Sequence, residues 1–400
     1  MGCSSSKTEP AYLRCTPLEE TEVRSFKQER SKEHHEHTYA ACATMDPPPP
    51  LPISSSKVGI YSNAGYKRRF GCPPQTTNQD RGLISYPLGG NSEQMMLAVF
   101  DGHGDYGHEV SDFVAFTLPR EYELRPPGDV EHRLCCAATA TERKMREKFP
   151  TAADKSGTTA VAAVLSPTGL TVACVGDSRC VLGRSLPCGG WEAVPLTIDQ
   201  TGSLEEEAAR IKAAGGTLHV NPCKNSCRVI HPEGYSLAMT RALGDWVFDG
   251  MGKICDPVFT TVELGAEDRC VILASDGLWE FITSQEAIDI CLQHHESATK
   301  ACRALITQAT FQWQKVHQGD YRDDITIIVA FLKARLAAFE SLGSRMPPRC
   351  WPVCTSKRES CRPSSQDLFD NASADDQEGA ARTVVLDAAG TKLQPDQCGS

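Results

Sequence analysis

Three apolar stretches of the sequence adjoin aspartates, and this placement could support metal chemistry. The junctions are Leu97-Ala98-Val99-Phe100-Asp101-Gly102-His103-Gly104, Val271-Ile272-Leu273-Ala274-Ser275-Asp276-Gly277, and Asp323-Asp324 followed by Ile325 to Leu332. Apolar runs of this length, bounded by turn residues, predict buried strands. Carboxylate and carbonyl oxygens are the ligands that Mg²⁺ and Mn²⁺ prefer. The pattern therefore predicts a site for hard divalent cations at the ends of three strands.

Asp80, Asp101, Asp276 and Asp323 would together form a strongly anionic pocket. Like-charge repulsion destabilises such a cluster on its own, and two divalent ions would relieve the repulsion while polarising a bridging water. The glycines after Asp101 and Asp276 allow close backbone approach, so the carbonyl of Gly102 can itself be a metal ligand.

The elements that must position these acids are predicted to be antiparallel strands with helices between them. Strands predicted over 158–165, 170–175 and 180–182 are separated by four residues each. Connections that short join antiparallel strands, because a parallel return needs a crossover of about a dozen residues. Helices are predicted over 131–148 and 298–313, and after capping boxes at 203–206 and 283–286. This order predicts an α+β fold with helices outside the sheets.

Some polar residues are predicted to have structural roles only. Arg241 and Asp245 are four positions apart, a spacing that suits an internal ion pair. Asp199 lies just before one of the predicted capped helices.

Composition separates a folded body from two polar ends. Residues 58–335 carry the alternating apolar patterns, whereas 1–57 predict a disordered tether and 336–400 a disordered tail. The net charge of −10 argues against a dedicated nucleic-acid surface, and no apolar run reaches the roughly 18 residues that span a bilayer. The 19 cysteines are scattered and no secretory signal opens the chain, so reduced thiols and a protein that is not secreted are expected.

The first residues predict a lipid anchor. Met1-Gly2-Cys3-Ser4-Ser5-Ser6 fits N-myristoylation of Gly2, with Cys3 available for a palmitate. One myristoyl chain binds a membrane only marginally, and a second acyl chain makes the attachment durable. We therefore expect the protein on the cytoplasmic face of a membrane, with the plasma membrane as the expected location.

Eight motifs occur in an order that resembles one enzyme family. They are Asn78-Gln79-Asp80, Val99-Phe100-Asp101-Gly102-His103-Gly104, Ser156-Gly157-Thr158-Thr159-Ala160, Val175-Gly176-Asp177-Ser178-Arg179, Leu196-Thr197-Ile198-Asp199, Met239-Thr240-Arg241-Ala242-Leu243-Gly244-Asp245, Ala274-Ser275-Asp276-Gly277-Leu278-Trp279 and Asp323-Asp324-Ile325-Thr326. The sequence from 58 to 335 resembles the metal-dependent protein serine/threonine phosphatases of type 2C, the PPM family. Asp105-Tyr106-Gly107-His108 is similar to the plant and protist branch.

The resemblance implies a four-layer α-β-β-α sandwich of two antiparallel sheets, with a binuclear Mg²⁺ or Mn²⁺ centre at one end. Its metal positions match Asp80, Asp101, the Gly102 carbonyl, Asp276 and Asp323, and Asp177 matches a ligand of a weaker third ion. At the catalytic centre, beside Asp101, His103 matches the general acid that protonates the departing Ser/Thr oxygen.

The sequence departs from the family at the position that commonly grips the substrate phosphate. Many relatives have arginine or lysine five residues before the first aspartate, and here that residue is Gln75. Lys67, Arg68 and Arg69 lie upstream and are the candidates for this role from a different loop. Glu280 stands where the family usually has aspartate, which affects the expected third-ion site.

The expected function is Mg²⁺- or Mn²⁺-dependent hydrolysis of phosphoserine and phosphothreonine in proteins by a metal-activated water, at a membrane surface. The expected partners are phosphorylated proteins and a membrane, and the expected state is a monomer. The alternative is a catalytically weak, lipid-anchored pseudophosphatase that acts as a regulatory or scaffold module.

Overall fold

The computed structural model of the chain describes residues 53–67 and 77–332, apart from 92, 168 and 222–225, together with three short strands near the chain ends. These strands are β1 (Tyr12–Arg14), β2 (Thr21–Glu22) and β21 (Thr383–Val385). All of these residues belong to one compact unit formed by 1–334 and 381–400. The predicted boundaries at 57 and 335 stay a prediction.

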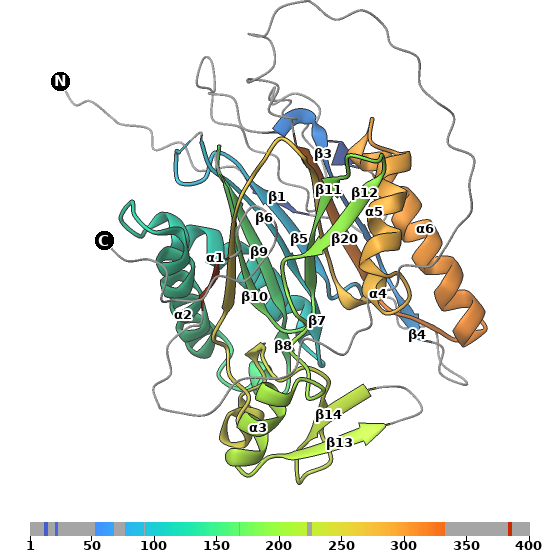
Figure 1. Cartoon of the computed structure of the whole chain (residues 1–400). Coiled ribbons are helices and arrows are strands. Elements are labelled where there is room, and N and C mark those ends of the chain that lie inside the picture. Colours follow the sequence, from blue (N-terminus) through green and yellow to red (C-terminus); the bar gives the residue numbers. More distant parts are fainter. Residues whose placement is uncertain are drawn as a thin grey trace, which may run out of the picture. The chain divides into compact units, whose positions relative to one another are not determined.

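Two large sheets form the centre of this unit (Figure 1). The seven-stranded sheet has the order β1, β5 (Arg81–Ser85), β6 (Met95–Phe100), β9 (Ala160–Leu165), β10 (Gly169–Val175), β17 (Val258–Glu263), β21. The six-stranded sheet has the order β12 (Trp191–Pro195), β11 (Arg179–Ser185), β18 (Asp268–Ala274), β20 (Ile325–Leu332), β3 (Ile53–Asn63), β2. Neighbouring strands are antiparallel, except that β17 and β21 are parallel.

The apolar runs are continuous because both faces of these strands are covered. In β6, Leu97 and Val99 point into the core between the two sheets, where they join Leu273 of β18 and Ile328 of β20. The alternate residues of β6, including Phe100, pack against helices on the outer face. A strand buried on both sides loses the polar alternation of a half-exposed strand, which is why the sequence shows an unbroken apolar run.

Helices cover the outer face of each sheet (Figure 1). The seven-stranded sheet is covered by α1 (Gly107–Glu123) and α2 (Val130–Lys148). The six-stranded sheet is covered by α4 (Asp276–Trp279), α5 (Ser284–Gln293) and α6 (Ala298–His317). The α+β sandwich predicted from the sequence is therefore confirmed. Within the described ranges, none of the helices combines the length and apolar character needed to cross a bilayer.

Three smaller sheets and short helices accompany the two large sheets in the described part of the chain. Short strands β7 (Gly102–His103), β8 (Gly157–Thr158) and β16 (Leu243–Gly244) form one small sheet, and β4 (Tyr66–Lys67) pairs with β19 (Tyr321–Arg322). A third comprises β13 (Thr217–Asn221), β14 (Ser226–Ile230) and β15 (Ser236–Leu237), beside α3 (Glu205–Ala213). The 3₁₀ helices η1 (Ala152–Asp154) and η2 (Trp246–Met251) complete the chain path.

The structure corrects the prediction for one of the two capping boxes. Thr283 and Glu286 form the predicted capping box at α5. At α3, in contrast, the N-cap is Leu204 and no side chain caps the helix, so Ser203 does not have the predicted role. Helix α1 was not anticipated, because Pro119 lies inside it and Gly107 begins it.

The short connection between β10 and β11 has a different role from the one between β9 and β10. Strands β9 and β10 are antiparallel neighbours, as the short connection between them predicts. The turn after β10 instead crosses from the seven-stranded sheet to the six-stranded sheet. Gly176 in this turn has a φ of 103°, which favours glycine.

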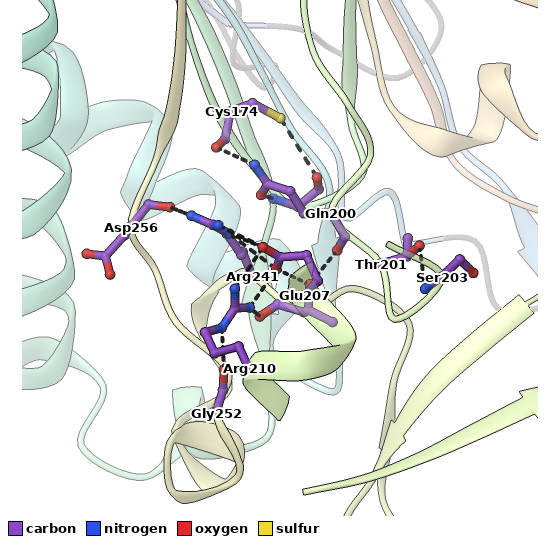
Figure 2. Close-up of polar contacts among 11 residues, drawn as sticks. Cys174, Gln200, Thr201, Ser203, Glu207, Arg210, Arg241, Gly252 and Asp256 are labelled. Carbon is purple, nitrogen blue, oxygen red and sulfur yellow. Dashed lines mark hydrogen bonds and ion pairs between the residues drawn. The ribbon is translucent and has the colours of Figure 1, made fainter. Parts of the chain in front are cut away.

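The predicted ion pair between Arg241 and Asp245 is wrong. Arg241 instead donates to Glu207 of α3, with 2.7 Å between Nη2 and Oε1, and Arg210 donates to the same carboxylate with 2.5 Å between Nη2 and Oε2 (Figure 2). Thr240 adds a third donor. Burial alone would raise the pKa of Glu207, but the hydrogen bonds from Arg210, Arg241 and Thr240 outweigh it and lower the pKa to about 2. This buried cluster attaches α3 to the segment that precedes β16.

We expect Glu207→Ala to destabilise the fold by about 3 kcal/mol, because the substitution leaves two arginines near the core without their carboxylate. Urea unfolding at pH 7 measures this change. Glu205→Ala, at an exposed position in the first turn of the same helix, is the matched control and should stay within about 0.5 kcal/mol of wild type.

The pH dependence follows from the lowered pKa. The contribution of Glu207 is fully present above its unfolded pKa near 4.5 and is lost as the pH falls toward about 2. The difference between wild type and Glu207→Ala should therefore narrow over that interval. A difference that stays constant with pH would contradict the electrostatic role.

Candidate active site

Strand register brings Asp80 and Asp101 together at one end of the seven-stranded sheet. Arg81, the first residue of β5, pairs with Phe100, the last residue of β6. Asp80 immediately precedes β5 and Asp101 immediately follows β6. The antiparallel pairing of the two strands therefore puts the two acids side by side. One strand pair thus brings together two acids that are 21 positions apart in the sequence.

The six-stranded sheet contributes the other acids in the same way. Arg179 at the start of β11 pairs with Ala274 at the end of β18. Asp177 in the crossing turn and Asp276 at the start of α4 lie just beyond these ends. Asp323 immediately follows β19 and lies two residues before β20, which pairs with β18.

The five carboxylates lie close together, because the charges of the other four each affect the pKa of Asp101. Burial, followed by the charges of the other four acids, raises the pKa of Asp101 well above its usual value. For Asp276 the causes are burial and then the charges of Asp323, Asp177 and Asp80. The charges of neighbouring acids therefore make it harder for Asp101 and Asp276 to ionise, although a hydrogen bond with Asp101 partly offsets this effect at Asp276.

Asp80 is the most deeply placed of these acids. Its side chain is buried, and Oδ2 accepts a hydrogen bond of 2.7 Å from the Ser275 hydroxyl. Burial and the charge of Asp324 raise the pKa of Asp80 to about 8. Its second oxygen, Oδ1, is buried and has no hydrogen-bond partner among the described residues. An acceptor in this position is suited to a cation.

Asp177 has a similar unsatisfied oxygen. Oδ1 of Asp177 is buried without a hydrogen bond in the part of the chain that the structure describes. Burial, with the charge of Asp199 next, raises its pKa to about 6, while the charge of His103 opposes this shift. His103 therefore lies close enough to influence the acid cluster.

The donor set fits divalent cations of the Mg²⁺ and Mn²⁺ type. The donor oxygens belong to carboxylates, and two of these oxygens are buried without a hydrogen bond among the described residues. The charges of the neighbouring acids raise the pKa of Asp101. Across the described ranges, no three His, Cys, Asp or Glu side chains converge as a ready-made ligand group.

Gly102 is fitted closely between neighbouring backbone segments. A Cβ at this position would lie 2.5 Å from the Gln79 carbonyl oxygen and would also clash with the Gly107 carbonyl. Only glycine lets the chain pass here, beside Asp80 and Asp101, so the backbone around the predicted carbonyl ligand is fixed in place.

Residues next to the acid cluster, which were not predicted, hold the loops that carry the acids. Asp324 accepts hydrogen bonds from the backbone N–H groups of Gly65 and Gln79, at 2.5 and 2.6 Å. Asp323 accepts one from the Tyr321 hydroxyl at 2.6 Å. The Asp323-Asp324 doublet in the sequence could have indicated this division, in which one acid faces the cluster and the other clamps the loop before Asp80.

His103 is oriented by Asp245. Its Nε2 lies 2.5 Å from Oδ2 of Asp245, whose side chain is buried. Burial by itself lowers the pKa of His103, but the charge of Asp245 and this hydrogen bond outweigh it, so the pKa is raised. Asp245 has a φ of 52°, a left-handed conformation that a regular element would not supply. Sequence spacing could not reveal this partner.

Of the three residues expected to bind the substrate phosphate, Lys67, Arg68 and Arg69, only Lys67 is among the described residues. Burial raises the pKa of Asp323, and the charge of Lys67 is among the contributions that oppose this shift, so Lys67 lies near the acid cluster. Arg68 and Arg69, together with Gln75 and the proposed lipid acceptors Gly2 and Cys3, lie outside the described residues. Glu280 follows α4 and is exposed.

Comparisons with known proteins agree with this arrangement. Residues 72–313 match the family described as Protein phosphatase 2C. Probable protein phosphatase 2C 64 of Oryza sativa subsp. japonica is 33% identical over 297 residues, which cover 69% of this chain and 68% of the relative. Probable protein phosphatase 2C 73 of Arabidopsis thaliana is 31% identical over 308 residues, with coverage of 70% and 80%.

A solved structure supports the fold. The structure of serine-threonine phosphatase 2C from Toxoplasma gondii is similar with a TM-score of 0.60 and 22% identity, over 71% of this chain and 98% of that chain. Together with the sequence matches, the sandwich defines a protein phosphatase. The chain belongs to the protein phosphatase 2C family, as its motifs predicted, and the family depends on Mg²⁺ or Mn²⁺ in general.

We expect Asp101→Asn to stabilise the metal-free protein by about 1–2 kcal/mol, because it removes one charge from a repelling cluster with little change in shape. The same substitution should reduce the rise in Tm that Mn²⁺ or Mg²⁺ produces in wild type, since ligands that bind the native state stabilise it. Thermal unfolding after chelation and after addition of Mn²⁺ measures both effects.

Glu147→Gln removes an equal charge from an exposed position of α2 and is the control. It should leave the response to Mn²⁺ as in wild type. A rise in Tm on adding Mn²⁺ that is as large in Asp101→Asn as in wild type would remove Asp101 from the ion site.

Proposed function

We propose that this protein hydrolyses phosphoserine and phosphothreonine in proteins with the help of two Mg²⁺ or Mn²⁺ ions, at a membrane surface. The observation that carries the hydrolytic role is the cluster of five neighbouring carboxylates from two sheets, with His103 beside it. The negative charges in this site repel one another, and bound cations would offset this repulsion and attract a phosphate.

The chain supplies the ligands from both sheets. Asp80, Asp101, the Gly102 carbonyl, Asp276 and Asp323 would hold the two principal ions, and Asp177 would contribute to a weaker third. When bound, such ions neutralise charge on the phosphate oxygens and lower the pKa of a water. Lys67, with Arg68 and Arg69, would assist by attracting the substrate phosphate.

His103 would donate the proton that the leaving oxygen requires. In the hydrolysis, a water oxygen bonds to phosphorus while the bond from phosphorus to the Ser/Thr oxygen breaks, and that oxygen takes up a proton. Nε2 of His103 is engaged by Asp245, whereas Nδ1 makes no hydrogen bond among the described residues, although the Asp101 carbonyl is near enough to affect the pKa. The raised pKa favours the protonated form that this role needs.

The membrane location rests on the sequence of the first residues. Gly2 would carry a myristoyl group and Cys3 a palmitoyl group, and the two chains together would give durable attachment. The proposed site is the cytoplasmic face of a membrane, where phosphoproteins would be the substrates.

The central experiment measures hydrolysis of a phosphothreonine peptide and of an aryl phosphate with and without Mn²⁺. Wild type should act on both and should lose activity on chelation, and Asp101→Asn should be nearly inactive. His103→Ala should lower kcat for the peptide by about 10²–10⁴-fold. The loss should be much smaller for the aryl phosphate, because its leaving group needs less protonation.

The outcomes separate the enzyme from the pseudophosphatase. Hydrolysis that needs no metal, or that survives Asp101→Asn, would contradict the proposed mechanism. Absence of hydrolysis in a folded wild-type protein that binds Mn²⁺ would favour a lipid-anchored regulatory or scaffold module. Equal losses on the two substrates in His103→Ala would contradict the assignment of His103 as the general acid.

The lipid anchor is tested by fractionation of cells that express the full chain. Gly2→Ala should release the protein to the soluble fraction, because it removes the acceptor of the first acyl chain. Cys3→Ala should weaken retention without abolishing it. Ser4→Ala is the control and should remain on membranes. Retention of both Gly2→Ala and Cys3→Ala would overturn the lipid hypothesis.

A further inference from the structure

We propose that a pocket beside His103 binds an anionic side chain next to the phosphorylated residue of the substrate, so that the enzyme prefers phosphopeptides with a flanking carboxylate or second phosphate. This inference rests on the proposed function, since it concerns the peptide that carries the leaving oxygen. It adds a specificity determinant that the metal site does not provide.

The pocket has a volume of about 260 Å³ and opens next to the proposed general acid. Its lining includes His103 and Asp245, together with the apolar side chains of Leu237, Met239 and Phe248. The oxygen that receives the proton from His103 belongs to the substrate's own Ser or Thr. The peptide on either side of that residue must therefore leave the metal site past His103, and the pocket lies at this place.

Lys155 contributes one cation to the pocket. It lies two residues before Gly157, which pairs with His103 in the small sheet. The Lys155 ammonium donates to the Tyr235 hydroxyl at 2.5 Å and lies 4.0 Å from the centre of the Tyr235 ring. Its nearest carboxylate, that of Glu233, is 3.9 Å away and largely exposed, so this pairing is weak. Lys155 is thus held at the pocket with its charge available.

Arg228 contributes a second cation from another part of the chain. Along β14, Cys227 and Val229 are buried, whereas Arg228 points to the other, exposed face. Its Nε donates to the Ser236 hydroxyl at 3.4 Å. In the described part of the chain, no carboxylate forms an ion pair with Arg228. The guanidinium therefore keeps most of its donors for a ligand.

The chemistry of the two cations selects an anion. The guanidinium of arginine matches the geometry of both carboxylate and phosphate, and lysine adds a compact positive charge. The chain as a whole has a net charge of −10, so two cations converging on one pocket depart from its general balance. The apolar side chains in the lining would lower the local dielectric and strengthen the attraction of the two cations for an anionic side chain.

The test compares kcat/KM for dephosphorylation of the phosphothreonine in peptides of three kinds, in which the neighbouring residue is alanine, glutamate or phosphoserine. Assays contain Mn²⁺, and the anion is placed one or two residues to either side. Wild type should prefer at least one anionic peptide over the alanine peptide by about ten-fold, as expected for one or two charge-assisted contacts. The glutamate and phosphoserine arms identify which anion is the better ligand.

Variants assign the preference to the pocket. Lys155→Ala combined with Arg228→Ala should reduce the ratio of anionic to neutral kcat/KM to about one. Arg228→Lys should retain part of it because the charge remains. Arg143→Ala and Lys300→Ala, at exposed positions on α2 and α6, are the matched controls and should keep the wild-type ratio.

The outcomes distinguish this inference from the proposed function. Equal kcat/KM for anionic and neutral peptides in wild type, or a preference that persists in the double variant, would overturn the inference alone. Failure of wild type to hydrolyse any of the peptides in the presence of Mn²⁺ would overturn the proposed function and this inference with it.

Discussion

Repulsion among the clustered carboxylates is the constraint on which this structure depends. Asp80 and Asp101 come from one sheet and Asp276 and Asp323 from the other. Asp80 is buried and the other three are half-buried, which limits the screening of their charges by water. A flexible chain would separate such groups. Here the core between the sheets, with Leu97, Val99 and Leu273, holds the strand ends in place. The hydrophobic free energy of the sandwich therefore sustains an arrangement that is unfavourable in itself and suited to cations.

A small set of polar contacts converts this scaffold into a defined site. The hydroxyl of Ser275 donates to Asp80 and accepts a hydrogen bond of 3.0 Å from the Thr326 amide, so it links β18, β20 and the acid before β5. Thr159 has a comparable role beside Asp101. The backbone amide of Asp101 donates a hydrogen bond of 3.0 Å to the Thr159 hydroxyl. Asp324 clamps the loop that leads to Asp80. These residues fix the directions of the acids without belonging to the proposed ligand set.

The acids that the structure brings together were all singled out in the sequence, whereas most residues that hold them in place were not, for physical reasons. Apolar runs such as that before Asp101 are the strongest local signal of a buried strand, and the motif order then indicated Asp80 and Asp177. The partner of His103 was not predictable, because Asp245 is 142 positions away and has a left-handed backbone conformation. The pairing of Arg241 with Glu207 was missed for a related reason, since helical spacing was applied to a segment that is not a helix. The crossing turn after β10 was missed because turn length determines strand direction but does not determine which sheet the next strand joins.

The crossing turn that carries Asp177 has a consequence for how the molecule moves. It connects the two sheets covalently at the edge where the carboxylates meet, so sliding of one sheet over the other would change the spacing between Asp101 and Asp276. Ions held between those acids would resist this sliding, and by thermodynamic reciprocity the quality of the core would set the affinity for the ions. A cavity made far from the acids, for example at Leu97, would then weaken ion binding through the mechanical stiffness of the sandwich. Packing and metal affinity are in this sense one property of the fold.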